Sequence, residues 1–303
     1  MIERIVLGCG NFGGMGSAPE LFGHGESEEE AFAIMDAAWG AGIRWFDTAD
    51  AYGGGRSEST IGKWIASTGN RPRLTTKTYN PMDAGHDRGL SRDRVLRQIE
   101  TSLERLGVDR VDLYLAHEFD PDVPLRETIR AFGELADGGL VGAYGLSNFN
   151  ARQVEEAARI GRPRLVQNEF SLLMRGDEDE LLPLCAGRGI AYQAFSPLGG
   201  GWLTGKYRAG EEFPSGSRMT LRPGPYEHLV HDRTFRALEE LQAEAAERDL
   251  ELPTLALAWV LAHPQVSGIV VGPRRAEHLE PALRALDVVL SDSERLELAT
   301  RFP

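Results

Sequence analysis

The stretch from Trp45 to Gly62 reads WFDTADAYGGGRSESTIG and decides the fold. It begins as a strand, because residues such as Trp45 and Phe46 favour β-structure. A glycine-rich turn follows, after which the chain resumes as a helix. Asp47 therefore falls at the carboxyl end of a strand, and Tyr52 lies five residues later in the loop. A carboxylate and a phenol brought together there can carry out proton chemistry at the mouth of a parallel α/β fold.

Short runs that favour strands recur along the chain, and helical patterns lie between most of them. The predicted strands are Ile5–Leu7, Ile43–Phe46, Leu74–Thr76, Val111–Leu115, Val141–Gly145, Leu165–Gln167, Ile190–Phe195 and Val266–Val271. Eight such alternations in 303 residues are typical of an α/β fold of the (β/α)8 TIM barrel type. A doubly wound sheet is the competing topology, since it shares the alternation. No proline-rich or serine-rich linker divides the chain, so residues 1–303 are predicted to form a single barrel domain.

Several helices carry clear start signals. Ser27, followed by Glu30, is a capping box for the helix through Ala38. Ser91 is expected to cap the helix Val95–Leu106, whose apolar residues recur at helical spacing. Helical patterns also cover Leu125–Leu135, Ala151–Ile160 and Arg233–Arg248. The long connections Cys9–Glu26 and Ser196–Asp232 follow the first and seventh strands, and loops of that length in a compact domain are usually functional or disordered.

The composition excludes several classes of protein. The chain has 33 basic and 46 acidic residues, so its formal net charge is −13. Such an acidic surface argues against broad binding to nucleic acid or to anionic membranes. The two cysteines, the lack of a signal sequence and the short apolar runs predict a soluble cytoplasmic protein. These features leave room for a local basic pocket that holds a phosphate.

Two motifs are set aside. Gly8 to Gly13 matches the dinucleotide-binding pattern G-x-G-x-x-G, but that pattern needs a helix to begin within it. No helical pattern starts until Ser27, so a Rossmann site is rejected. His228 and His231 form an H-x-x-H pair without carboxylates or cysteines at ligand spacing, so no metal site is predicted.

Four ionisable residues follow or end three consecutive predicted strands: Asp47, Tyr52, Lys77 and His117. A lysine at an inner strand end must be paired, and Asp47 is the obvious partner. The ammonium of Lys77 is expected to lower the pKa of Tyr52 toward the range useful for proton transfer. His117 is placed to donate a hydrogen bond to a substrate oxygen.

These residues, in this order, resemble the catalytic tetrad of the aldo-keto reductases, especially the bacterial reductases and the potassium-channel β-subunit branch. The resemblance extends over nearly the whole chain. It continues through the segments 145–148 (GLSN), 166–168 (VQN), 195–200 (FSPLGG), 203–207 (LTGKY) and 271–275 (VGPRR). The family fold is the (β/α)8 barrel, in agreement with the strand count.

The resemblance implies a role for each residue. Tyr52 would protonate a carbonyl as a hydride arrives from the nicotinamide, with Lys77 and Asp47 tuning Tyr52 and His117 orienting the carbonyl. The residues expected to bind the cofactor are Asn11, Phe12, Asp47, Ser147, Asn148, Gln167, Phe195, Ser196, Pro197, Leu198, Gly200, Lys206, Arg218, Gly272, Arg274 and His278. Besides Tyr52 and His117, the substrate is expected to contact Tyr79 and Phe119, with Asn11 and Phe12 as further wall residues.

Lys206 matches a family position that contacts the pyrophosphate, and Arg218 and Arg274 match positions near the adenosine phosphate. The resemblance therefore implies NADP(H) in preference to NAD(H), because arginine offers bidentate hydrogen bonds to a 2′-phosphate. Pro281 and Ala282 depart from the family, which often has a Glu-Asn pair there for the adenine. The expected function is NADPH-dependent reduction of a small aldehyde or ketone. The alternatives are a sugar dehydrogenase at the same site, or a cofactor-binding regulatory subunit of low turnover. A homo-oligomer is left open.

Overall fold

The computed structural model describes residues 2–82, 85 and 87–302. Its eight strands are β1 (Ile5–Gly8), β2 (Trp45–Asp47), β3 (Arg73–Thr78), β4 (Val111–Ala116), β5 (Val141–Ser147), β6 (Leu165–Glu169), β7 (Ala191–Phe195) and β8 (Gly268–Val271). Each strand pairs in parallel with the next, and β8 pairs with β1 to close the barrel. The predicted barrel is confirmed, and the doubly wound alternative is wrong.

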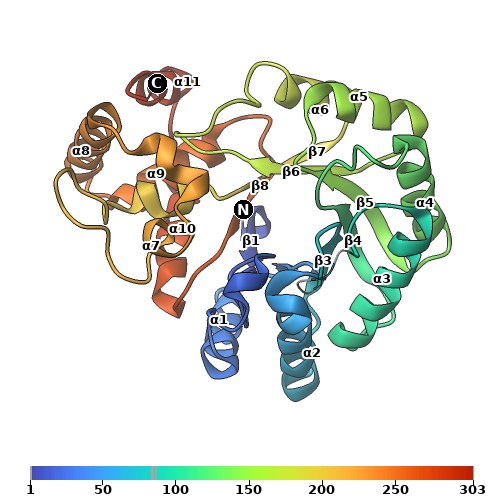
Figure 1. Cartoon of the computed structure of the whole chain (residues 1–303). Helices are drawn as coiled ribbons and strands as arrows, with labels where there is room; N and C mark the ends of the chain where they lie inside the picture. The colour runs from blue at the N-terminus through green and yellow to red at the C-terminus, as the bar shows by residue number, and fades with distance from the viewer. Residues whose placement is uncertain (1, 83–84, 86, 303) are drawn as a thin grey trace.

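The helices lie outside this barrel, as Figure 1 shows. They are α1 (Glu28–Gly40), α2 (Arg56–Thr68), α3 (Arg92–Leu106), α4 (Leu125–Asp137), α5 (Ala151–Ile160), α6 (Leu181–Arg188), α7 (Arg218–Leu221), α8 (Asp232–Glu247), α9 (Leu252–Ala262), α10 (Glu280–Ala285) and α11 (Asp292–Thr300). Short 3₁₀ turns occur at η1 (Ile2–Arg4), η2 (Pro19–Leu21), η3 (Tyr52–Gly55), η4 (Gly199–Thr204), η5 (Gly224–Leu229) and η6 (Ala276–Leu279). In the described part of the chain, no helix is long and apolar enough to cross a membrane.

The helix caps show how local sequence sets these boundaries. The Ser27 hydroxyl accepts from the Glu30 amide at 3.2 Å, and the Glu30 carboxylate accepts from the Ser27 amide at 2.8 Å. The predicted capping box is therefore present. Ser91 is the N-cap residue of α3, but its side chain makes no cap hydrogen bond. Glu127 caps α3 instead, by accepting from the Arg92 amide at 3.0 Å.

The last predicted strand is shorter than its apolar run. Val266 is buried, but its amide donates to the carbonyl of His263 in a turn, so the ladder starts only at Gly268. The apolar run from Leu255 to Ala262 belongs to α9, which is buried on nearly all sides. A helix that is apolar all round is stable only inside the protein, where neighbouring helices cover it.

The two long loops are partly ordered by their own contacts. The loop after β1 is closed by a bridge between Phe12 and Glu26 and contains η2. The loop after β7 contains η4, α7 and η5. Both loops leave the carboxyl ends of strands, the end of a barrel at which enzymes of this fold carry their sites.

Candidate active site

A cavity of about 1040 Å³ opens at the carboxyl ends of the strands. Most of the residues that the sequence predicts for the site line it. They are Asn11, Asp47, Tyr52, His117, Ser147, Asn148, Gln167, Phe195, Ser196, Pro197, Leu198, Gly200, Lys206, Arg218, Gly272, Arg274 and His278. Its size suits a ligand as large as a dinucleotide with a small second molecule.

An ion pair lies behind the cavity wall. Lys77, on β3, pairs with Asp47 at the end of β2, and their side chains are 1% and 3% exposed. The Lys77 ammonium also donates to the carbonyl of Thr48 at 3.0 Å and reaches the Tyr52 hydroxyl at 3.4 Å. A buried ammonium needs such partners, because an unpaired charge inside a protein is costly. The ion pair thus holds a fixed cation against the phenol.

The Tyr52 hydroxyl lies between two nitrogen atoms. It is 3.4 Å from Lys77 Nζ and 3.4 Å from His117 Nε2. The amide of Asn80 lies 3.4 Å from the other ring nitrogen of His117, Nδ1. If that amide donates to Nδ1, the imidazole proton resides on Nε2 and faces Tyr52.

The environment sets the charge of each group. Burial acts to lower the pKa of Lys77, but Asp47 and Tyr52 outweigh it and the net shift is upward. Burial and the nearby Lys77 hold the pKa of His117 well below its usual range. At neutral pH the site therefore has a charged lysine and an uncharged histidine.

The pKa of Tyr52 is raised, which corrects the expectation drawn from sequence. Burial raises this pKa most, and the Asp47 carboxylate raises it further. Lys77 lowers it, but the net shift of the Tyr52 pKa is upward. The phenol therefore stays protonated at neutral pH and can act as a proton donor. The expectation failed because the depth of burial cannot be read from the spacing of the residues.

A chain of hydrogen bonds crosses the mouth of the barrel. The amide nitrogen of Gln167, on β6, donates to Asp47 Oδ2 and to Gln193 Oε1, each at 2.8 Å. Gln167 and Gln193 are register partners on β6 and β7. Both hydrogen bonds are made by the amide nitrogen of Gln167, so its amide oxygen has no partner among the described residues.

Two polar residues at the end of β5 lie beside Gln167. Ser147 is its register partner, and Asn148 follows with a left-handed backbone, φ 60°. The Asn148 amide donates to the carbonyl of His117 at 2.9 Å and to Ser147 Oγ at 3.3 Å. Together the three side chains offer acceptors and donors to a bound amide group.

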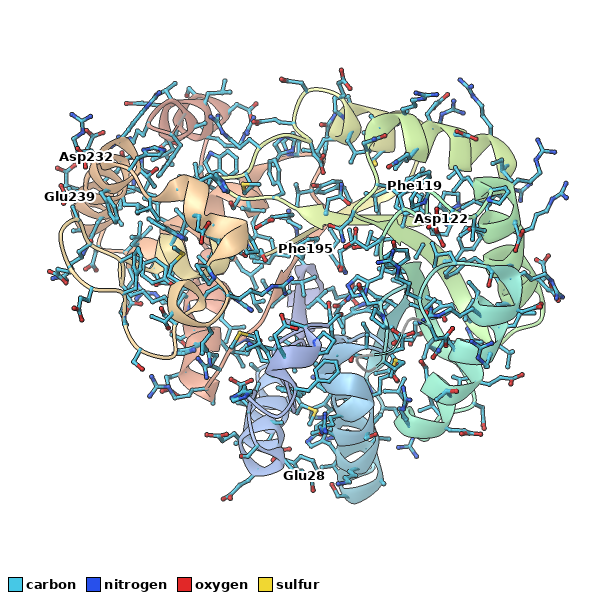
Figure 2. All side chains as sticks on the ribbon, in the orientation of Figure 1. Glu28, Phe119, Asp122, Phe195, Asp232 and Glu239 are labelled. Atoms are coloured by element: carbon cyan, nitrogen blue, oxygen red, sulfur yellow. The ribbon has the colours of Figure 1, made fainter. Side chains whose placement is uncertain are left out.

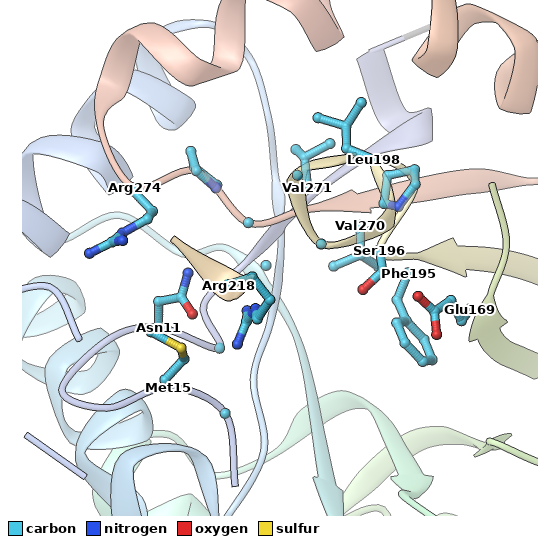
Figure 3. Close-up of a pocket in the computed structure, with 18 of the residues that line it drawn as sticks. Asn11, Met15, Glu169, Phe195, Ser196, Leu198, Arg218, Val270, Val271 and Arg274 are labelled. Carbon is cyan, nitrogen blue, oxygen red and sulfur yellow. The ribbon is translucent and has the colours of Figure 1, made fainter. Parts of the chain in front are cut away.

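The cations gather toward another part of the cavity. Figure 3 shows Arg218 and Arg274 on one side of the view and Phe195 with Glu169 on the other. Burial lowers the pKa of Lys206, and the two arginines lower it further, so the three charges repel one another. Such a cluster is suited to an anion.

The two arginines differ in their partners. Arg274 Nε donates to Glu26 at 2.9 Å, and Nη1 donates to the carbonyl of Gly216 at 2.8 Å. The guanidinium of Arg218 makes no hydrogen bond or ion pair with any residue that the structure describes. Of these two arginines, Arg218 is therefore the more available to an incoming phosphate.

Three of the residues expected to contact the cofactor or the substrate do not line the cavity. Phe12 is fully buried in the core of the protein. Phe119 packs edge to face on Phe149, with ring centroids 5.5 Å apart, and Tyr79 packs against the core. Figure 2 shows Phe195 near the middle of the molecule and Phe119 toward α4 and α5. The expected aromatic wall is corrected: these rings pack inward on their neighbours.

Other residues at the site were missed from the sequence. Asn80, Glu118 and Glu169 line the cavity, Gln193 holds Gln167, and Glu26 holds Arg274. The only signal available for them was position, since Asn80 and Glu118 follow predicted strand ends closely. Within the residues described, no group of three histidine, cysteine, aspartate or glutamate side chains could hold a metal ion.

Known proteins are similar to this chain in sequence and in fold. The chain is 33% identical over 282 residues to a probable voltage-gated potassium channel subunit beta of Oryza sativa subsp. japonica, covering 88% of this chain and 85% of that protein. It is 35% identical over 315 residues to the uncharacterized oxidoreductase YrpG of Bacillus subtilis, covering 98% and 91%. The thermostable aldo-keto reductase Tm1743 has a similar structure, with a TM-score of 0.77, 30% identity and coverage of 98% and 94%.

The names of two further relatives give different cofactors. One is the aldo-keto reductase yakc [NADP(+)] of Schizosaccharomyces pombe, 30% identical over 91% of this chain and 83% of that protein. The other is the NADH-specific methylglyoxal reductase of Escherichia coli, 31% identical over 84% and 81%. Residues 4–299 match the Aldo/keto reductase family. The chain therefore belongs to the aldo/keto reductase family, and it is an oxidoreductase that reduces carbonyl groups with NAD(P)H.

Proposed function

We propose that this protein reduces a small aldehyde or ketone to an alcohol with NADPH, and that Tyr52 donates the proton. The observation that carries the proposal is the position of the Tyr52 hydroxyl, 3.4 Å from both Lys77 Nζ and His117 Nε2 at the wall of the cavity. A carbonyl oxygen at this point would meet a protonated phenol and a neutral imidazole. General acid catalysis requires such a donor within hydrogen-bond reach.

Each side chain around the carbonyl oxygen has its own role. Tyr52 donates the proton, and the charged Lys77 stabilises the phenolate that remains. His117, with its proton on Nε2, would donate a second hydrogen bond that fixes the carbonyl. Because the pKa of Tyr52 is raised, the phenol is in the acid form at neutral pH, which favours reduction over the reverse oxidation.

The residues present fit a nicotinamide cofactor. The amide oxygens of Asn148 and Gln167 have no partner among the described residues, so they can accept from a carboxamide, and Ser147 adds a hydroxyl. Phe195 gives an apolar face at the end of β7. When bound, the reduced nicotinamide supplies the hydride. Lys206, Arg218 and Arg274 would hold the phosphates.

The first prediction concerns the choice of cofactor. Because Arg218 has no partner among the described residues, Arg218→Ala is expected to weaken NADPH binding by about 10–100-fold, the value of a hydrogen bond to a charged group. The binding of NADH should change much less, since it lacks the 2′-phosphate. Arg274→Ala should have a smaller effect, because Glu26 already neutralises that arginine. Fluorescence titration of the unaltered protein and both variants with each cofactor measures the six affinities.

Equal losses for NADPH and NADH in Arg218→Ala would place this arginine on a phosphate that both cofactors share. Equal affinity of the unaltered protein for both cofactors would contradict the preference itself. Arg208→Ala is a suitable control, since Arg208 is exposed and does not line the cavity.

A second prediction concerns Asn80, which positions His117. Asn80→Ala removes the amide that faces Nδ1 and is expected to lower kcat by about tenfold, the cost of roughly one or two hydrogen bonds. In a His117→Ala background the same change should alter kcat by less than about twofold, because coupled residues are non-additive. Steady-state rates of the unaltered protein, the two single variants and the double variant complete this double-mutant cycle. Full additivity would show that Asn80 does not act through His117.

The proposed function is tested by following loss of NADPH with a panel of aldehydes and ketones. The reverse reaction is followed as formation of NADPH from NADP⁺ and the corresponding alcohols. Turnover of carbonyls that disappears in Tyr52→Phe supports the proposed function. A protein that binds NADPH tightly but turns over none of the carbonyls or alcohols would contradict it. That result would favour the low-turnover regulatory alternative.

A further inference from the structure

The cavity wall beside His117 is polar. Asn80 contacts the imidazole, and Glu118 is the next residue in the chain; both line the cavity. Neither Tyr79 nor Phe119, the aromatic neighbours of these two residues, is among the described residues that line it. Beside His117, these two segments therefore present polar side chains to the cavity and keep their aromatic rings out of it.

Glu118 has no partner of its own. Its carboxylate makes no hydrogen bond or ion pair with any described residue, although the side chain is partly buried. Burial raises the pKa of Glu118. Carboxylates held partly out of water are normally paired. An unpaired one in a ligand cavity is suited to receive a donor from the ligand.

Two further carboxylates, those of Asp120 and Asp122, lie on the loop that carries Glu118. Burial raises the pKa of Tyr79 most, and all three carboxylates raise it further. Arg88 acts in the opposite direction, but it is exposed to solvent. Asp120 is buried and accepts from the amides of Leu90 and Asp122 at 2.7 and 2.9 Å, so it is fixed in place. Arg94 also lies behind this wall, where it donates to the carbonyl of Asn80 at 2.9 Å. Of the three carboxylates on this loop, Glu118 is the one that lines the cavity, so its charge is the one that a ligand meets directly.

We infer that Glu118 selects the substrate by charge: it favours a carbonyl compound with an ammonium or hydroxyl group a few bonds from the carbonyl, and rejects one with a carboxylate there. This inference rests on the proposed function, because it assumes that the carbonyl lies at Tyr52 and His117. It assigns Glu118 as a specificity-determining residue beside the proton donor. Coulomb repulsion across a partly desolvated cavity changes affinity on the order of tenfold at such short range.

Three aldehydes of similar length test the charge dependence. They are succinic semialdehyde, which is anionic, its neutral methyl ester, and 4-(trimethylammonio)butanal, which is cationic. We compare kcat/KM of each in the unaltered protein and in Glu118→Gln, which keeps the shape and removes the charge. Because each compound is compared with itself, differences in intrinsic reactivity cancel. Glyceraldehyde and propanal form a second pair that tests whether a hydroxyl alone satisfies Glu118.

The expected result is a loss of the charge preference. In Glu118→Gln, kcat/KM of the anionic aldehyde relative to the neutral ester should rise about tenfold, or about 1.4 kcal/mol. The kcat/KM of the cationic aldehyde relative to the same ester should fall several-fold. The neutral ester should change by less than about twofold. Glu118→Asp should keep the original order. If only the ammonium ratio responds and the glyceraldehyde ratio does not, the hydroxyl half of the inference is overturned.

Glu239→Gln is the matched control, since it makes the same change of net charge on α8. Figure 2 places Glu239 at the edge of the molecule, away from Phe195 of the cavity. This control should leave all the ratios unchanged. Equal ratios in Glu118→Gln and the unaltered protein would overturn the inference. Failure of the proposed function gives a different result: the unaltered protein would not reduce even the neutral ester.

Discussion

Tyr52→Phe is expected to lower kcat for carbonyl reduction by about 10²–10⁴-fold, the range that general acid catalysis contributes. The change removes a single oxygen atom, which lies 3.4 Å from both Lys77 and His117. The ring remains, and with it the contact between the Tyr52 and His117 rings, whose centroids are 5.4 Å apart. The fold and the cofactor affinity should therefore stay close to those of the unaltered protein.

The measurement is steady-state kcat with a reactive aldehyde, together with NADPH titration and thermal unfolding of both proteins. Tyr79→Phe is the matched control, because it makes the same chemical change at a ring that packs against the core and does not line the cavity. It should keep kcat within about twofold, as a substitution away from the reacting atoms does. A Tyr52→Phe protein that keeps its turnover would show that another group or a water molecule delivers the proton.

The pH dependence gives a second check on the same residue. The pKa of Tyr52 is raised by burial, so the acid form persists through the neutral range, and the low pKa of His117 leaves the imidazole uncharged there. The rate of reduction should therefore show no ionisation of either group between about pH 6 and 9. The oxidation of an alcohol needs the phenolate and should rise with pH throughout this range. A bell-shaped reduction profile centred near neutrality would contradict these assignments.

The fold could be predicted because its signals are local. The strand and helix patterns depend on residues within a few positions of one another, and the capping box at Ser27 is an example. Strand ends also placed Asp47, Lys77 and His117 at one edge of the barrel, since parallel strands bring their carboxyl ends together. The grouping of these residues therefore follows from their sequence positions and the topology alone.

The wall of the cavity could not be predicted in the same way. Whether Phe119 faces a ligand or packs on Phe149 depends on loop geometry that no spacing rule gives. The pKa of Tyr52 depends on how deeply the site is buried, which emerges only when the whole barrel closes. Asn80 and Glu118 carry no motif, and their positions beside His117 appear only in three dimensions.

Asp47→Ala is expected to destabilise the protein by about 3–5 kcal/mol, because it leaves a buried charge without its counter-ion. In the unaltered protein, Lys77 Nζ pairs with Asp47 and otherwise contacts only the Thr48 carbonyl and the Tyr52 hydroxyl among described residues. Glu134→Ala is a suitable control, since it breaks an exposed pair with Arg92. Exposed pairs of this kind contribute about 0–1 kcal/mol. Urea unfolding at neutral pH measures both losses.

Without Asp47, burial should depress the pKa of Lys77 below its unfolded value, because burial is the largest influence on that group. The unfolded chain then binds a proton that the folded variant does not, so the stability of Asp47→Ala should rise with pH between neutrality and the unfolded pKa of about 10.4. The gap between the variant and the unaltered protein should therefore narrow as the pH is raised. A constant gap would mean that Lys77 remains charged and finds another partner.

The double variant Asp47→Ala/Lys77→Met separates stability from activity. Removing both charges should restore part of the lost stability, because an apolar side chain in place of a buried ion pair is often neutral or stabilising. Activity should not return, since the phenolate left on Tyr52 no longer has a cation beside it. If the double variant recovers turnover together with stability, then the ion pair serves the fold of the barrel mouth and Tyr52 works without it.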